Sequence, residues 1–240
     1  MELKSFLSDR DAERARRTLV KLRRHGIAPL VLTGGLAIER HLMHGQGAQT
    51  RPLNDVDFLA QSFDDIPGSL ASDFLIIHVH PHDPPGKTLL QLVDRETAVR
   101  IDIFRDYGNS LSRAIPIEIE GIVLRMVSVE DLTARFARLC MDLAFDMPVP
   151  AKHVRDLLRL LPLVKIDAMD QIWHEHRKPD HPQPFKETAT LLAGLSAERK
   201  DLQIFTEYSR NAHEQCSRCK SVAIFPLADK GHVLSLIGYC

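Results

Sequence analysis

The chain has 240 residues, 44% of them hydrophobic and 26% charged, so it is long enough to bury a substantial core and has the composition of a globular protein. The formal net charge of -1 excludes a global attraction to nucleic acid or to a membrane surface, so an anionic partner would have to meet a local patch. No apolar run reaches the roughly 20 residues that span a bilayer, and the N-terminus lacks the apolar stretch of a signal peptide, so we expect no membrane partner.

The first predicted element is an amphipathic helix that Ser8 caps and Gly26 ends. Its apolar positions recur at helical spacing, at Ala12, Ala15, Leu19 and Leu22. The remaining faces of this helix carry a run of basic side chains: Arg10, Arg14, Arg16, Arg17, Lys21, Arg23 and Arg24. Such a run is typical of a solvated helix face, and contact with nucleic acid is the alternative.

Strand-like and helical segments then follow one another. A short apolar run over 30–32 ends in Thr33-Gly34-Gly35 and leads into a helix expected from residue 36 to about 44. Further strands are expected at 55–59, 74–79, 89–93, 99–104 and 115–119. Ser128 begins a long helix, with Asp131 in a capping-box position. The pattern then stays helical to about residue 210, with breaks at Pro148, Pro162 and a proline-rich stretch over 178–184 that we interpret as a linker.

These segments predict an α/β (α+β) fold with a mixed sheet and flanking helices. We place this α/β domain at residues 1–125, a helical domain at 126–210 and a small cysteine-bearing tail at 211–240.

Three aspartates on the predicted strands carry the chemistry. Alternate side chains of a strand share a face, so Asp55 and Asp57 project from the same side, and Asp102 lies opposite its buried neighbours Ile101 and Ile103. Two such strands side by side would bring three carboxylates together. Clustered carboxylates raise one another's pKa, and a divalent cation removes this cost. Mg²⁺ prefers oxygen ligands and also accepts substrate phosphates, and a pair of such ions supports phosphoryl-type transfer.

The strand-to-helix turn at Thr33-Gly34-Gly35 complements this cluster. Glycines let the backbone approach a ligand closely, and the amides at a helix N-terminus attract phosphate. The order of turn, helix, Asp-x-Asp strand and later lone Asp favours a metal site over three unrelated residues. In the structural alternative, Asp55 caps a turn, Asp57 pairs with Arg51, and Asp102 pairs with Arg100 or Arg105.

The segments at residues 33–37 and 54–57 resemble the signature of the DNA polymerase β-type nucleotidyltransferase superfamily. Within it, the sequence looks most like bacterial minimal nucleotidyltransferases and the nucleotidyltransferase toxins of abortive-infection systems. The resemblance implies that Gly34 and Gly35, with Thr33 beside them, hold the triphosphate. It also implies that Asp55 and Asp57 bind both metals, as Mg²⁺ or Mn²⁺, and that Asp102 completes the site and helps to activate the acceptor hydroxyl.

The similarity continues weakly at 127–132 and 152–157, so it covers about residues 27–162. Two departures stand out. Asn54 occupies a position where the family often has Thr or Ser. A lysine that the family often carries in the helix after residue 132 is absent, so Arg135 or Arg138 would have to replace it.

The resemblance implies an enzyme that transfers a nucleoside monophosphate from an NTP to an acceptor hydroxyl and releases pyrophosphate. RNA, a protein or a small molecule would each suit as the acceptor, and a toxin role is implied by the resemblance alone. One alternative is a catalytically inactive module of the same fold that binds nucleic acid or a protein partner. Another is an interaction protein whose acidic cluster is incidental.

The tail contains a Cys-x-x-Cys pair, Cys216 and Cys219. Together with His213 and either His232 or Cys240, this pair could form a structural zinc site, and two ordinary thiols are the alternative. Three of the four cysteines lie in this tail, which does not resemble a disulfide framework, so we expect a cytoplasmic protein.

Overall fold

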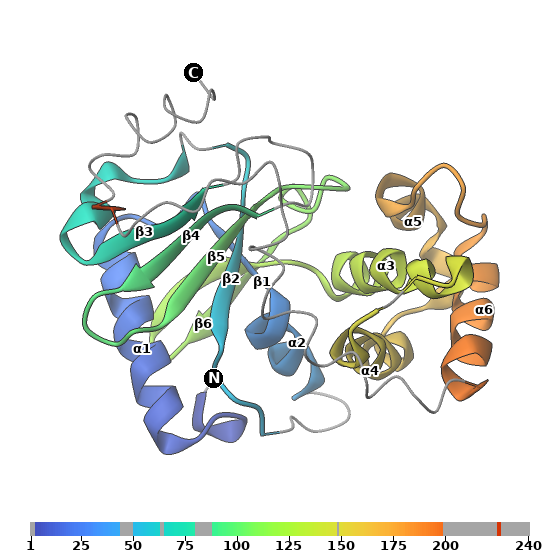
Figure 1. Ribbon diagram of the computed structural model, residues 1–240, viewed down its shortest axis with the longest axis horizontal. Helices are drawn as coiled ribbons and strands as arrows, with labels where there is room; N and C mark the ends of the chain where they lie inside the picture. The colour runs from blue at the N-terminus through green and yellow to red at the C-terminus, as the bar shows by residue number, and fades with distance from the viewer. Residues whose placement is uncertain are drawn as a thin grey trace.

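The computed structural model describes residues 3–43, 50–62, 65–79, 88–147, 149–198 and 225–226. Figure 1 shows a twisted sheet on one side of the molecule and a group of helices on the other. The predicted zinc ligands all lie outside the described residues: His213, Cys216, Cys219, His232 and Cys240.

The sheet has the strand order β6-β7-β1-β2-β5-β4-β3-β8. The pairs β1–β7 and β2–β5 are parallel and the others antiparallel, which confirms the predicted mixed sheet. The strands are β1 (Val31–Thr33), β2 (Asp55–Ala60), β3 (Phe74–Val79), β4 (Thr88–Asp94), β5 (Arg100–Arg105), β6 (Ile115–Ile119), β7 (Ile122–Met126) and β8 (Phe225–Pro226).

Strand β7 was not predicted from the sequence. It pairs with β6 through a two-residue turn, Glu120 and Gly121, whose φ angles of 50° and 75° suit a tight hairpin. Its parallel pairing with β1 places the end of β7 beside the Gly-Gly turn region.

Six α-helices accompany the sheet in the described part of the chain: α1 (Asp9–Arg24), α2 (Gly34–Leu42), α3 (Val129–Cys140), α4 (Ala151–Leu160), α5 (Asp170–His176) and α6 (Phe185–Glu198). Short 3₁₀ helices occur at Leu3–Ser5, Gly68–Ser72, Met141–Phe145, Leu161–Leu163 and Ile166–Ala168. Helix α2 contacts β1 and β2 as well as α3 and α4, so it joins the sheet to the helical group (Figure 1). None of the described helices has the length and apolar character needed to cross a membrane.

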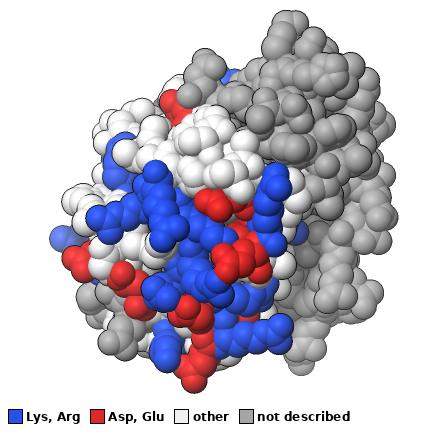
Figure 2. All heavy atoms as spheres, turned by 90° about the vertical axis from the view of Figure 1, so that its left-hand side faces the viewer, with Lys and Arg blue, Asp and Glu red and all other residues white. Residues whose placement is uncertain are grey.

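Helix α1 begins and ends as predicted, because the Ser8 hydroxyl accepts a hydrogen bond from the Asp11 amide and Gly26 adopts a φ of 78°. Its basic face is interleaved with acidic side chains in Figure 2. The ion pairs there include Arg14–Asp11, Arg16–Glu13 and Arg17–Glu96, whereas Lys21 is buried and pairs with Asp94. This pairing agrees with the solvated-face interpretation of the charge run.

The proline-rich stretch over 178–184 is a packed connection between α5 and α6, which differs from the linker we expected. The Trp173 indole donates a hydrogen bond of 2.8 Å to the Pro182 carbonyl, and the His181 ring stacks on Trp173 at 5.8 Å between centroids. His181 is 3% exposed. A buried aromatic contact of this kind holds the prolines against the helical group.

Candidate active site

The three predicted aspartates meet on neighbouring strands. In the parallel β2–β5 pair, Asp57 lies opposite Asp102 and Asp55 lies opposite Arg100. One carboxylate oxygen from each aspartate lies within 4.8 Å of the others. The strand alternation therefore places these side chains as expected, and the pairing of β2 with β5 brings them together.

The aspartates belong to a polar row that crosses four strands. Thr33 on β1 lies opposite Asp57, and Gln91 on β4 lies opposite Asp102. The Gln91 amide donates a hydrogen bond of 3.0 Å to Oδ1 of Asp102. Sequence reasoning missed Gln91, although it stands between two buried leucines, Leu90 and Leu92, and is itself 3% exposed. A polar residue between buried positions of a strand is the signal that could have found it.

The Gly-Gly turn lies directly against Asp57. Helix α2 begins at Gly34, two residues earlier than predicted, and the Gly35 amide donates to Oδ2 of Asp57 at 3.4 Å. Gly34 has a φ of 62°, and a Cβ built there would lie 1.8 Å from Asp57 Oδ2. Only glycine fits this position, because a side chain would be strained by the backbone and would collide with the carboxylate.

Arg100 bridges two members of the cluster. Its Nη2 contacts Oδ2 of Asp55, and its Nε lies 3.0 Å from Oδ1 of Asp102. The Arg100–Asp102 pairing was one of the structural alternatives, whereas Arg51 pairs with Glu39 at 3.3 Å. The cluster thus contains three carboxylates and one guanidinium.

The surroundings resist ionisation of the cluster. Burial raises the pKa of Asp57 well above its ordinary value, and the charges of Asp55 and Asp102 raise it further. Burial also raises the pKa of Asp102 to about 6, although Arg100 opposes this change. The charge of Lys152, at the start of α4, opposes this rise in the pKa of Asp57.

The donor set fits a divalent cation. All three groups are carboxylates, which are the ligands that Mg²⁺ and Mn²⁺ accept readily. Carboxylate oxygens that lie within 4.8 Å of one another could hold a divalent cation between them. A cation would also relieve the repulsion that raises the pKa values of Asp57 and Asp102.

Aromatic and basic side chains border the turn. Burial raises the pKa of Tyr107, whereas the charge of Arg135 and the side chain of Thr33 oppose this change. The Arg135 guanidinium lies 3.8 Å from the centroid of the Tyr107 ring. Of the two arginines expected to replace the family lysine, Arg135 is therefore connected to the turn through Tyr107.

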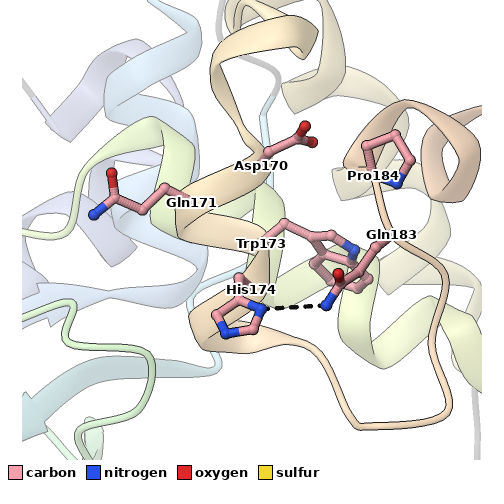
Figure 3. Close-up of a pocket in the computed structure, with 6 residues that line it drawn as sticks. All are labelled: Asp170, Gln171, Trp173, His174, Gln183 and Pro184. Atoms are coloured by element: carbon pink, nitrogen blue, oxygen red, sulfur yellow. Dashed lines mark hydrogen bonds between the residues drawn. The ribbon is translucent and has the colours of Figure 1, made fainter.

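A separate hollow of about 490 Å³ lies in the helical group (Figure 3). The residues that line it come from α5 and from the connection to α6: Asp170, Gln171, Trp173, His174, Gln183 and Pro184. None of the predicted site residues lines this hollow. The candidate active site is therefore the aspartate cluster and not this hollow.

No protein-family model matches the chain, and no curated protein matches its sequence. Several solved structures resemble the fold. One is an antigenic nucleotidyltransferase-like protein from Paracoccidioides brasiliensis, with a TM-score of 0.43 and 19% identity over 83% of this chain and 93% of that protein. Another is ANT(2'')-Ia in complex with adenylyl-2''-tobramycin, with a TM-score of 0.42 and 14% identity over 76% of this chain and 95% of that protein.

The first of these proteins is described as nucleotidyltransferase-like, and the second is described in complex with an adenylylated tobramycin. At identities below 20% and TM-scores below 0.5, they assign neither a reaction nor an acceptor to this chain. The function must therefore be inferred from the geometry of the site.

Proposed function

We propose that the protein is a metal-dependent nucleotidyltransferase that moves a nucleoside monophosphate from an NTP to an acceptor hydroxyl. The observation that carries this proposal is the contact between the Gly-Gly turn and the carboxylate cluster. The Gly35 amide and Oδ2 of Asp57 are 3.4 Å apart, so a phosphate held at the turn would lie beside the carboxylates. Such chemistry depends mainly on positioning and on neutralising charge.

In this proposal, Gly34 and Gly35 hold the triphosphate, and Thr33, directly before them, contributes to the same binding site. Asp55, Asp57 and Asp102 would hold Mg²⁺ or Mn²⁺, which would supply positive charge to the triphosphate. The acceptor oxygen forms a bond to the α-phosphorus as the bond from that phosphorus to the bridging oxygen breaks, and pyrophosphate leaves. In this proposal, Asp102 would also receive the proton that the acceptor hydroxyl loses.

We also propose a division of the chain into domains. We assign the turn and the aspartates to the α/β domain at 1–125 and the flanking helices to the domain at 126–210. The tail at 211–240, with its zinc interpretation at His213, Cys216, Cys219 and Cys240, stays a prediction.

The test is transfer of label from each of four α-phosphate-labelled NTPs, with Mg²⁺ and a crude cell extract. We expect label in RNA, protein or small molecules with the wild type and none with Asp57→Ala. Asp9→Asn is the matched control, because Asp9 pairs with Lys4 on the surface and is 87% exposed. Label with Asp57→Ala at the wild-type level would refute the assignment.

A second candidate, an inactive module that binds a partner, is favoured by one observation. Arg100 contacts Asp55 and Asp102 and so neutralises part of the negative charge of the cluster. An inactive protein of the same fold that binds no metal would require such neutralisation. NTP binding separates the two candidates. An enzyme should bind NTP more tightly with Mg²⁺ and lose this effect in Asp57→Ala, whereas the inactive module should be indifferent to both.

A further inference from the structure

A buried ion-pair cluster joins the Gly-Gly turn to helix α4. At its centre is Glu39 of α2, which is 1% exposed. Arg159 of α4 donates to both carboxylate oxygens of Glu39, at 2.7 and 2.9 Å. Arg51, from the segment before β2, donates to the same carboxylate at 3.3 Å. One carboxylate of α2 therefore binds one arginine from the segment before β2 and one from α4.

Arg51 also contacts the turn itself. Its Nη1 lies 3.4 Å from the Gly35 carbonyl oxygen, to which it donates. A Cβ at Gly35 would lie 3.0 to 3.3 Å from three atoms of the guanidinium. The missing side chain of Gly35 thus leaves the space in which the guanidinium lies against the backbone.

A second buried acid completes the cluster. Asp156 of α4 lies 3.8 Å from Nη2 of Arg51 and 3.9 Å from Nη1 of Arg159. Burial raises its pKa, which the neighbouring arginines oppose, and its Oδ1 has no hydrogen-bond partner among the described residues. With two acids and two arginines, the cluster is close to electrically neutral.

Fold stability alone is a weak reason for such an arrangement. Desolvating the charges of a buried pair offsets much of their attraction, and apolar side chains of similar volume often serve as well. The planar fork of an arginine, however, fixes the direction of its carboxylate partner, which an apolar contact does not. The two arginines therefore define how the start of α2 and the helix α4 sit against each other.

Lys152 lies at the start of the same helix α4. The position of α4 thus determines where one cation stands relative to the aspartates. The position of α2 determines where the amides of Gly34 and Gly35 point.

We propose that Glu39, Arg51 and Arg159 are positioning residues for the nucleotide. Glu39 fixes α4 relative to the Gly-Gly turn, and Arg51 fixes the Gly35 backbone, so that the turn amides keep the orientation in which they would bind the triphosphate. This inference rests on the proposed function. We call the ion-pair cluster of Glu39, Arg51 and Arg159 the brace, because it would hold the turn in a position that the aspartates alone do not fix.

The test measures binding of inorganic triphosphate with Mg²⁺ by isothermal titration calorimetry, and KM and kcat for the NTP in the transfer assay. We expect Glu39→Gln and Arg159→Met to raise Kd and KM about tenfold or more, which corresponds to about 1.4 kcal/mol, with a smaller change in kcat. Arg159→Lys keeps the charge without the fork, so it should restore part of the affinity, and it is also the variant to use if the others fail to fold.

Lys21→Met is the matched control. It breaks another buried ion pair, in which Lys21 Nζ lies 2.7 Å from Asp94 Oδ1, between α1 and the end of β4. It should lower the melting temperature as the brace variants do, with Kd and KM unchanged. An equal loss of affinity in Lys21→Met would overturn the brace, because the effect would then follow stability.

Two further outcomes separate the brace from the proposed function. Wild-type protein that binds Mg²⁺-triphosphate with the same Kd as Glu39→Gln and Arg159→Met would overturn the brace and leave the proposed function standing. Wild-type protein that binds no triphosphate at all would overturn both.

Discussion

Replacing Asp102 by Asn in the metal-free protein removes one of three clustered charges and keeps the shape of the side chain. Burial raises the pKa of Asp102 from its ordinary 3.8 to about 6. At about 1.4 kcal/mol per pKa unit, the ionised carboxylate in the folded protein costs about 3 kcal/mol at neutral pH. Asp102 is 5% exposed, so solvent screening removes little of this cost. We therefore expect Asp102→Asn to be more stable than the wild type by up to about 3 kcal/mol at pH 7.5.

The pH dependence follows from the direction of this change. A carboxyl whose folded pKa is raised contributes stability below its unfolded pKa and loses that contribution as the pH rises through the folded pKa. For Asp102 this window extends from about 3.8 to just above 6. The wild type should therefore lose stability across this window, whereas Asp102→Asn should lose less, and the two proteins should be close to equal at pH 4.

The assay is urea denaturation in the presence of EDTA, followed by far-UV circular dichroism, at pH 4, 5, 6 and 7.5. Asp94→Asn is the control of opposite sign. Asp94 accepts hydrogen bonds from Lys21 at 2.7 Å and from Thr18 at 2.9 Å, so its replacement leaves the buried Lys21 ammonium paired only with the half-exposed Glu96, at 2.8 Å. We expect Asp94→Asn to destabilise the protein by about 3 kcal/mol or more at pH 7.5.

A loss of stability in Asp102→Asn at pH 7.5 would refute this reasoning. The pairing with Arg100, 3.0 Å away, would then outweigh the cost of burial, and Asp102 would be a structural carboxylate.

Three further predictions concern the neighbours of Asp102. Mg²⁺ should raise the melting temperature of the wild type more at pH 7.5 than at pH 5, because the carboxylates bind metal when ionised, and thermal melts of Asp57→Asn should lack this effect. Gly34→Ala should abolish transfer and destabilise the protein, because its Cβ would lie 1.8 Å from Asp57 Oδ2. The control is Gly26→Ala, where φ is 78° but nothing lies within 4 Å of the added Cβ. In urea melts and transfer assays, this control should lower the free energy of unfolding by about 1 kcal/mol and leave transfer unchanged. Gln91→Leu should move the acidic limb of the kcat profile to higher pH, because the Gln91 hydrogen bond lowers the pKa of Asp102, and a limb that stays in place would show that Gln91 does not act on this carboxylate.

The face on which each aspartate lies was predictable from alternation alone. Ile101 and Ile103 are fully buried on either side of Asp102, so the period of the strand determines where this carboxylate points. The partner of that strand was not predictable in the same way. Strand β5 pairs with β2 although β3 and β4 come between them in the chain, and only the completed sheet sets the register that brings Asp57 opposite Asp102.

The partners of the arginines could not be predicted from the neighbouring sequence. Arg51 was considered as a partner for Asp57, but it pairs with Glu39, since a glutamate at 1% exposure requires compensation by positive charge. Arg100 was considered for Asp102 alone, yet the register also places it opposite Asp55. Both results depend on burial and strand pairing, which a sequence pattern does not contain.

The distribution of positive charge around the aspartates favours a site that binds a metal ion. It disfavours an inactive protein of the same fold in which Arg100 alone neutralises the cluster. Arg100 contacts Asp55 and lies 3.0 Å from Asp102, but no described residue forms an ion pair with Asp57. Asp57 is also the carboxylate that touches the Gly-Gly turn, and burial raises its pKa well above the ordinary value. A protein that had no use for a cation would gain stability by replacing Asp57 with a neutral side chain. The cost of retaining an acid without an ion-pair partner beside the Gly-Gly turn is explained if, as we propose, a metal ion and a triphosphate complete its surroundings.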